Sequence, residues 1–123
     1  MSHHIHHWSN LTTQDFGRIN TSRAIAVLPL AATEQHGPHL PLSVDVDIVE
    51  GVIQSAIAQL NASAHSAADA LNPQDLSILV LPTQGVGLSP EHAAFPGTLT
   101  LKSETLIRLW TDIAESVKAA GIH

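Results

Sequence analysis

The sequence predicts an α/β fold built around a parallel sheet, and three features of the chain lead to this prediction. Residues 24–30 (AIAVLPL) and 76–82 (LSILVLP) are continuous apolar runs of strand length, which is typical of strands covered on both faces. Between them, apolar residues recur at three- and four-residue steps over 46–60, as on one face of a helix: Ile48, Val49, Val52, Ile53, Ala56, Ile57 and Leu60. A strand, a crossover helix and a second buried strand form a βαβ unit, in which parallel pairing is strongly preferred.

The length and composition of the chain are those of one domain. At 123 residues, of which 44% are hydrophobic, the chain is long enough to bury a core and fold as one unit. It contains neither a long apolar run nor a basic, apolar N-terminal segment, so we expect no signal peptide, no membrane span and a cytoplasmic location. Five basic against 11 acidic residues give a net charge of −6 without a basic stripe, so nucleic acid is not an expected partner.

The absence of cysteine narrows the chemistry of any site. A chain without cysteine has no disulfides, no thiolate metal ligands and no cysteine nucleophile. Any metal ion would therefore be held by histidine, aspartate or glutamate.

Two segments precede the first predicted strand. Residues 1–10 (MSHHIHHWSN) contain four histidines, and we expect a flexible terminus; loose binding of transition metals by these histidines is the alternative. Next, Thr12 or Thr13 can cap a short helix that runs through Ile19, because a hydroxyl group there satisfies free N–H groups of the first turn. The domain itself is expected to span residues 11–123.

The second half of the chain continues in the same manner. Residues 61–75 are rich in Ala, Ser and Asn and predict a surface connection, and the loop over 83–97 leads into a short strand at 98–101 (TLTL). A second helix is expected from 104 to 120, ended by Gly121. Its apolar face is expected to hold Leu106, Ile107, Trp110, Ile113, Ala114 and Val117.

Three side chains with metal-binding groups follow the first predicted strand. Glu34 and His36 are two residues apart, so in an extended chain they project from the same face, and Asp45 lies at the start of the following helix. Ligands bind to parallel sheets in the crevice beyond the carboxyl ends of the strands, where these residues are expected. Their donors suit zinc or manganese, and a carboxylate can bridge two such ions, about 3.5–4 Å apart, that activate one water.

Each of these residues also has a purely structural explanation. A carboxylate such as Asp45 or Asp47 commonly caps a helix or interacts with its dipole, and a lone histidine such as His36 is commonly hydrogen-bonded within the fold. We expect His39 and Asp47 to be structural or to support the metal ligands. The convergence of three donors on one crevice favours the metal site.

The stretches EQHGPHLPLSVD (34–45) and SPEHAAFPGT (89–98) resemble two motifs of the creatininase (creatinine amidohydrolase) family, and the resemblance runs along nearly the whole chain. It implies a three-layer α/β/α fold with a mainly parallel sheet. It also implies a two-metal centre that adds water to a C–N bond, and a homo-oligomer, often a hexamer. The resemblance matches Glu34, His36 and Asp45 to metal ligands of the family, with Asp45 as the bridging carboxylate.

Two differences from creatininase itself restrict these implications. Creatininase lacks the pair Glu91 and His92 before its FPGT sequence, so the substrate is left open and we assign both residues to the substrate pocket. Family members also continue into a further strand and an Asn-Gly-His segment with more metal ligands. We therefore expect the N-terminal half of the fold, truncated after the second crossover helix, with Glu91, His92, His39 and His123 as the available replacements for further ligands.

The loop over 85–98 has the composition of a shaped pocket wall. Its prolines restrict the backbone, and its glycines permit conformations closed to other residues. We expect it to lie over the strand ends, with His92 within reach of His36.

Two hypotheses of different kinds follow. In the first, the protein is a metal-dependent amidohydrolase that acts on a small cyclic amide, a formamide or a related non-peptide C–N bond through a metal-activated water. In the second, it is a non-catalytic remnant or split subunit that retains the interaction surface of the fold and weak metal binding. We expect little activity from the 123-residue chain alone, because catalysis needs a fully assembled site.

Overall fold

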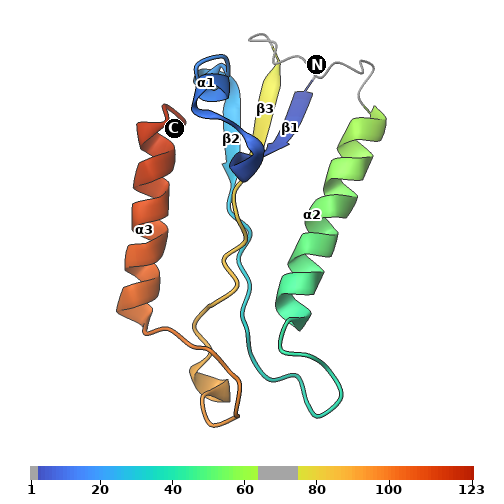
Figure 1. Ribbon diagram of the computed structural model, residues 1–123, viewed down its shortest axis with the longest axis vertical. Helices are drawn as coiled ribbons and strands as arrows, with labels where there is room; N and C mark the ends of the chain where they lie inside the picture. Colours follow the sequence, from blue (N-terminus) through green and yellow to red (C-terminus); the bar gives the residue numbers. More distant parts are fainter. Residues whose placement is uncertain (1–2, 64–74) are drawn as a thin grey trace.

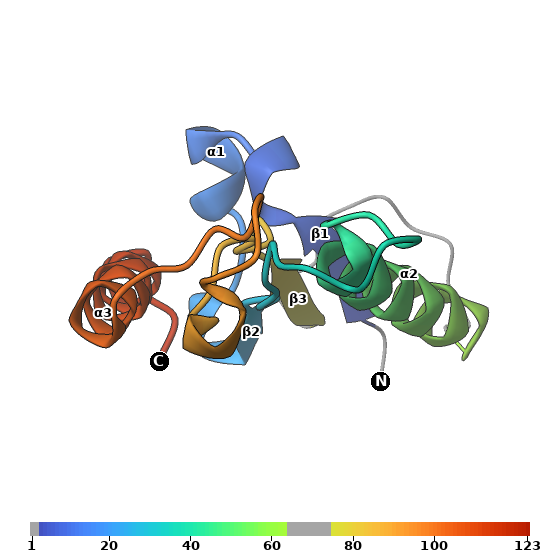
Figure 2. The same cartoon turned by 90° about the horizontal axis from the view of Figure 1, so that it is seen from below.

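The computed structural model describes residues 3–63 and 75–123, which form a sheet with helices on both sides. The strands are β1 (His3–His7), β2 (Ala24–Val27) and β3 (Leu76–Val80). The α-helices are α1 (Thr13–Phe16), α2 (Val44–Ser63) and α3 (Ser103–Ala119), and 3-10 turns η1, η2 and η3 span Trp8–Asn10, Thr21–Arg23 and Pro90–His92. Helices α2 and α3 lie on opposite sides of the sheet (Figures 1 and 2), as in an α/β/α arrangement.

Strand β3 forms the centre of the sheet, in the order β1-β3-β2, and both neighbours run parallel to it. Ile78 is paired with Ile5 on one side and with Ile25 on the other. Leu79 is fully buried, and Val80 is 5% exposed. A strand that is paired at both edges and covered on both faces has an apolar sequence, which explains the run at 76–82. The predicted α/β fold with a parallel sheet is confirmed.

One face of the sheet carries a compact apolar core. Ile19, Leu79 and Ile122 are buried in one cluster. Side chains from the N-terminal turns and from α3 pack against it, among them Trp8, Leu11, Phe16 and Val117. This core ties the N-terminal segment and the end of α3 to the central strand.

The N-terminus departs from the prediction. Residues 3–7 form strand β1, in register with β3 from His3–Leu76 to His7–Val80, so the expectation of a flexible terminus over 1–10 is wrong for these residues. His4 is buried, and its Nε2 lies 3.0 Å from Oδ2 of Asp75.

The helix ends follow local hydrogen bonding. Thr12 caps α1 through a capping box with Asp15, and the hydrogen bonds from Thr12 hold the pKa of the Asp15 carboxyl below its ordinary value. This helix ends at Phe16, before the predicted Ile19. Helix α2 is longer than the predicted 46–60, and the rest of the predicted connection, residues 64–74, lies outside the described residues.

The apolar faces of the two long helices are only partly covered. In α3, Leu106 is buried whereas Ile107 is 62% and Trp110 36% exposed, so part of the apolar face of this helix is uncovered. In α2, Ile48 and Val52 are both 61% exposed. Within the described ranges, no helix has the length and hydropathy needed to cross a bilayer.

The segments that follow β2 and β3 stay side by side beyond the sheet, and both run down toward η3 (Figure 1). The Leu81 amide donates to the Val27 carbonyl at 2.9 Å, and the Gln84 amide donates to Pro29 at 3.0 Å. The amide of Ala31 donates back to Gln84 at 2.9 Å. The predicted short strand 98–101 contributes isolated bridges to these segments, Thr33–Leu99 and Gly87–Thr100.

Truncation of the central strand's buried side chain tests this fold. We expect Leu79→Ala to lower the free energy of unfolding by about 2–5 kcal/mol, because it removes buried methyl groups and leaves a cavity. The matched control is Leu40→Ala, whose side chain is 47% exposed and for which a loss within about 0.5 kcal/mol is expected. Urea denaturation followed by circular dichroism measures both, and equal losses would contradict the assignment of β3 as the core strand.

Candidate metal centre

The backbone on both sides of Glu34 is fixed by long-range hydrogen bonds. The Thr33 hydroxyl donates to the Gly85 carbonyl at 2.6 Å, and the Leu99 amide donates to the Thr33 carbonyl at 2.9 Å. The Gln35 amide donates to the Thr98 hydroxyl at 3.2 Å. Glu34 therefore extends from a rigid segment between the two strand exits.

A sharp turn brings the next donors to the same place. Gly37 has a φ of +81°, a conformation that side chains disfavour, and its amide donates to Oε1 of Gln35 at 2.9 Å. The chain then turns back into α2, which begins at Val44 with Asp45 in its first turn. The turn and the helix start thus place His36 and Asp45 against each other.

Glu34, His36 and Asp45 form a cluster in which each residue offers one metal-ligand atom, and these atoms all lie within 4.8 Å of one another. Nε2 of His36 lies 3.4 Å from Oδ2 of Asp45. The three side chains are half-buried, with 16%, 21% and 32% of Glu34, His36 and Asp45 exposed. The structure therefore brings together the three residues that the sequence predicts as one site.

The chemistry of this cluster fits a bound cation. Nε2 of His36 is buried and makes no hydrogen bond with the described residues, although an unpaired buried polar atom commonly costs about 1–3 kcal/mol. Two carboxylates held this close repel each other unless positive charge lies between them. A divalent ion would satisfy the nitrogen and neutralise the carboxylates at once.

Two other predicted residues stand apart from the cluster. Asp47 is exposed and accepts a hydrogen bond from the Ser43 hydroxyl at 2.8 Å, while its amide donates to the Ser43 carbonyl. Asp47 thus stabilises the start of α2. His39 is exposed, with its ring beside Gly37.

The loop after β3 brings His92 to the cluster. Nε2 of His92 lies 3.6 Å from Oε1 of Glu34, and its Nδ1 lies 2.9 Å from Nε2 of Gln35. The ring also meets Phe95 edge-on, with 6.1 Å between the ring centroids. Sequence reasoning missed Gln35. Only its position between the predicted ligands Glu34 and His36 could have indicated that it belongs to the site.

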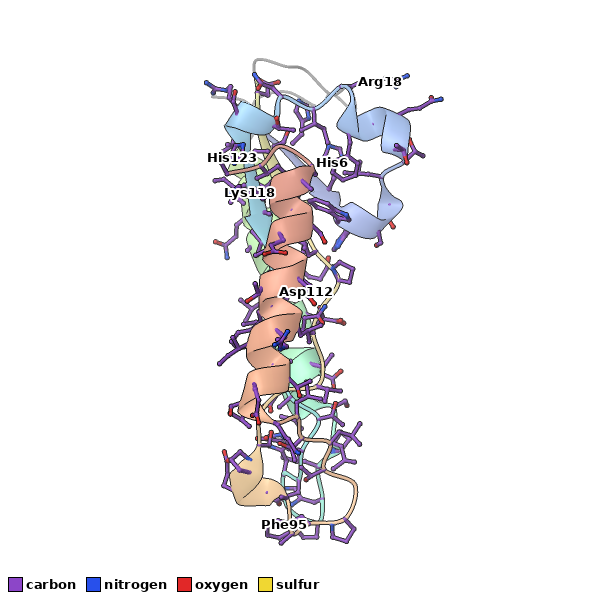
Figure 3. The ribbon with its side chains drawn as sticks, turned by 90° about the vertical axis from the view of Figure 1, so that its left-hand side faces the viewer. His6, Arg18, Phe95, Asp112, Lys118 and His123 are labelled. Carbon is purple, nitrogen blue, oxygen red and sulfur yellow. The ribbon has the colours of Figure 1, made fainter. Side chains whose placement is uncertain are left out.

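Figure 3 shows that the tip of this loop and the C-terminal His123 occupy opposite ends of the molecule. Phe95 lies at one tip, whereas His6, Arg18 and His123 lie at the other. His123 is therefore too far from the cluster to replace a metal ligand, and that expectation is wrong. The strand β1 that carries His6 is likewise remote from the site.

A broad open groove of about 700 Å³ adjoins the cluster between α2 and α3. Glu34, Asp45 and Glu91 supply its carboxylates. The rest of the lining is mainly apolar and includes Leu30, Ile48, Val52, Leu88, Leu106 and Trp110. Two of the three clustered residues thus face a space that can hold a ligand.

Comparison with known proteins identifies relatives over most of the chain. A peptidase of the mycofactocin precursor peptide from Mycolicibacterium smegmatis is 31% identical over 113 residues, which cover 92% of this chain and 42% of the relative. The protein of the same name from Mycobacterium tuberculosis is 37% identical over 102 residues, covering 79% of this chain and 36% of the relative. The chain thus spans about two fifths of the length of these relatives.

A family model also matches nearly the whole chain. The sequence model described as creatininase, creatinine amidohydrolase, matches residues 9–123. This match includes the strand exit, the start of α2 and the loop that carries His92. The chain belongs to the creatininase family.

Proposed function

We propose that Glu34, His36 and Asp45 bind a divalent metal ion, zinc or manganese, and that the protein is a metal-dependent hydrolase of an amide C–N bond. The observation that carries this proposal is the convergence of one nitrogen and two carboxylate donors within 4.8 Å, in which the histidine nitrogen is buried without a hydrogen bond and lies 3.4 Å from Oδ2 of Asp45. Membership of the creatininase family supports it.

The spacing of the donors suits a metal ion. Nitrogen and oxygen ligands lie about 2.0–2.2 Å from zinc, so two ligands of one ion are at most about 4.4 Å apart. The ligand atoms of the cluster all lie within 4.8 Å of one another, and the His36–Asp45 pair is 3.4 Å apart, so the donors are close to the spacing of ligands around one ion. Asp45 has two oxygens, and we propose that it bridges a second ion, as expected from the family resemblance.

The residues around the cluster supply the rest of the proposed mechanism. A divalent ion bound there would polarise the amide carbonyl and lower the pKa of water toward neutrality. The apolar side chains of the groove, such as Leu88 and Trp110, bind the apolar part of a substrate. Three carboxylates in one groove disfavour an anionic group beside the metal, so a neutral amide is the expected reacting group.

The substrate class that we propose is a peptide. The relatives are named as peptidases of a precursor peptide, and the groove beside the cluster is wide open and mainly apolar, which suits an extended peptide better than a small cyclic amide or formamide. The small-molecule amide expected from the sequence is therefore the second choice. A non-catalytic chain that binds metal weakly is the alternative to both.

We also propose that the protein self-associates, as the family resemblance implies. Self-association is supported by three exposed apolar side chains, Ile48 and Val52 on α2 and Ile107 on α3. Exposed apolar surface of this kind favours burial against another surface.

The metal assignment is tested by a matched pair of variants on one helix. Asp45→Ala is expected to weaken zinc or manganese binding by at least about 100-fold, because it removes a ligand, whereas loss of a supporting group typically costs about 10–100-fold. Asp47→Ala, which removes a carboxylate in the same turn but outside the cluster, is expected to change affinity by less than about threefold. Equilibrium dialysis measures both.

Both variants keep the N-terminal histidines, so background binding to that segment is equal in the two proteins. Equal retention of metal by both variants would contradict the assignment of Asp45 as a metal ligand.

The reaction class is tested by an assay on the full product of the gene that encodes these residues. We expect metal-dependent turnover of short peptides with apolar side chains and slower turnover of cyclic amides and formamides. Chelation, or the Glu34→Gln substitution, should lower the rate at least about 100-fold by removing the ion or one of its ligands. Turnover that survives both treatments would contradict a metal-dependent mechanism, and inactivity on every substrate would favour the non-catalytic alternative.

A further inference from the structure

We propose that His92 is a positioning residue that orients the Glu34 carboxylate for metal binding, and that Gln35 sets the tautomer in which His92 does so. The inference rests on the proposed function, since it assumes that Glu34 is a metal ligand. It assigns to His92 a role distinct from the substrate-pocket role expected from the sequence.

The orientation of the Gln35 amide is fixed by two partners. Its Oε1 accepts a hydrogen bond from the Gly37 amide at 2.9 Å, and a backbone N–H can only donate. The other end of the side-chain amide, Nε2, therefore faces Nδ1 of His92 at 2.9 Å. Exchange of the amide oxygen and nitrogen would place two donors against each other at Gly37, so this assignment follows from the hydrogen bonds.

The Gln35 amide in turn fixes the proton on the His92 ring. An amide nitrogen is a donor only, so Nδ1 of His92 accepts and the ring proton of the neutral imidazole resides on Nε2. Nε2 lies 3.6 Å from Oε1 of Glu34, and a small rotation brings this pair to hydrogen-bond distance. His92 thereby presents a donor to one oxygen of the carboxylate and leaves the other oxygen for an ion.

The support behind His92 is rigid enough for this role. The His92 amide donates to the carbonyl of Ser89 at 3.1 Å, and Ser89 is 1% exposed. The Ser89 amide donates to the Thr100 hydroxyl at 2.8 Å, which joins η3 to the segment beside the strand exits. Side-chain exposures of 26% for His92 and 16% for Glu34 limit competition from water for this contact.

Two substitutions at position 92 separate the two ring nitrogens. His92→Gln places an amide near the position of Nε2 and can still donate to Glu34. His92→Asn places its amide near Nδ1 and cannot reach Glu34. We expect His92→Asn and His92→Ala to weaken zinc binding by about 10–100-fold, the usual cost of losing a group that supports a metal ligand, and His92→Gln to restore affinity to within about threefold of the original.

The measurement is a zinc dissociation constant from competition with a chelating indicator, with Asp45→Ala as the baseline for binding elsewhere on the chain. Circular dichroism and the urea midpoint establish that each variant is folded. If the His92→Asn variant binds zinc as tightly as the unsubstituted protein, the proposal is overturned. Equal weakening in His92→Asn and His92→Gln overturns it too, because the ring shape and not the donor would then matter.

A second readout needs no metal. Long-range ¹H–¹⁵N spectra of the imidazole are expected to show His92 in the Nε2–H tautomer, and Gln35→Met, which removes the donor to Nδ1, is expected to produce a mixture of tautomers. A predominant Nδ1–H tautomer in the original protein overturns the proposal. If Glu34→Gln leaves zinc affinity unchanged, the proposed metal site itself fails; if Glu34→Gln abolishes binding while His92→Asn does not weaken it, the failure is confined to His92.

Discussion

The backbone pairing between the segments that leave β2 and β3 is the constraint on which the site depends. One hydrogen bond joins Val27 to Leu81, and two more join Gln84 to Pro29 and to Ala31. They continue the parallel arrangement past the ends of the strands. Gly87 lies in this region at a close approach of the two segments, since a Cβ atom there would lie 3.0 Å from the carbonyl oxygen of Ala31. Because the two exits stay adjacent, the residues that follow them, Glu34 on one and His92 on the other, meet although they are far apart in sequence.

The central part of the fold and the three clustered residues were predictable because their signals are local. A buried parallel strand has a continuous apolar sequence, and Glu34 and His36 share a face through a two-residue spacing. Strand β1 was not predictable, because its histidines are ordered by pairing with β3 and by Asp75, 71 residues from His4. The Gln35–His92 contact spans 57 residues and depends on how two loops are joined, which periodicity does not encode.

The helix faces show a different limit of sequence reasoning. Apolar periodicity identifies a helix but a wide apolar stripe does not indicate which of its residues face the sheet. Leu106 is buried, whereas Ile107 and Trp110 are exposed, and Trp110 lines the groove beside the cluster. The same pattern that stabilises α3 therefore also supplies one wall of the proposed substrate site.

Glu34, His36 and Asp45 are proposed to hold a metal ion with one nitrogen and two carboxylate ligands. Anomalous diffraction from a crystal grown with manganese or zinc, collected above and below the absorption edge of the metal, locates such an ion directly. We expect a peak within about 2.0–2.2 Å of a donor atom from each of the three side chains. Anomalous peaks confined to the histidines of β1, with none at the cluster, would contradict it.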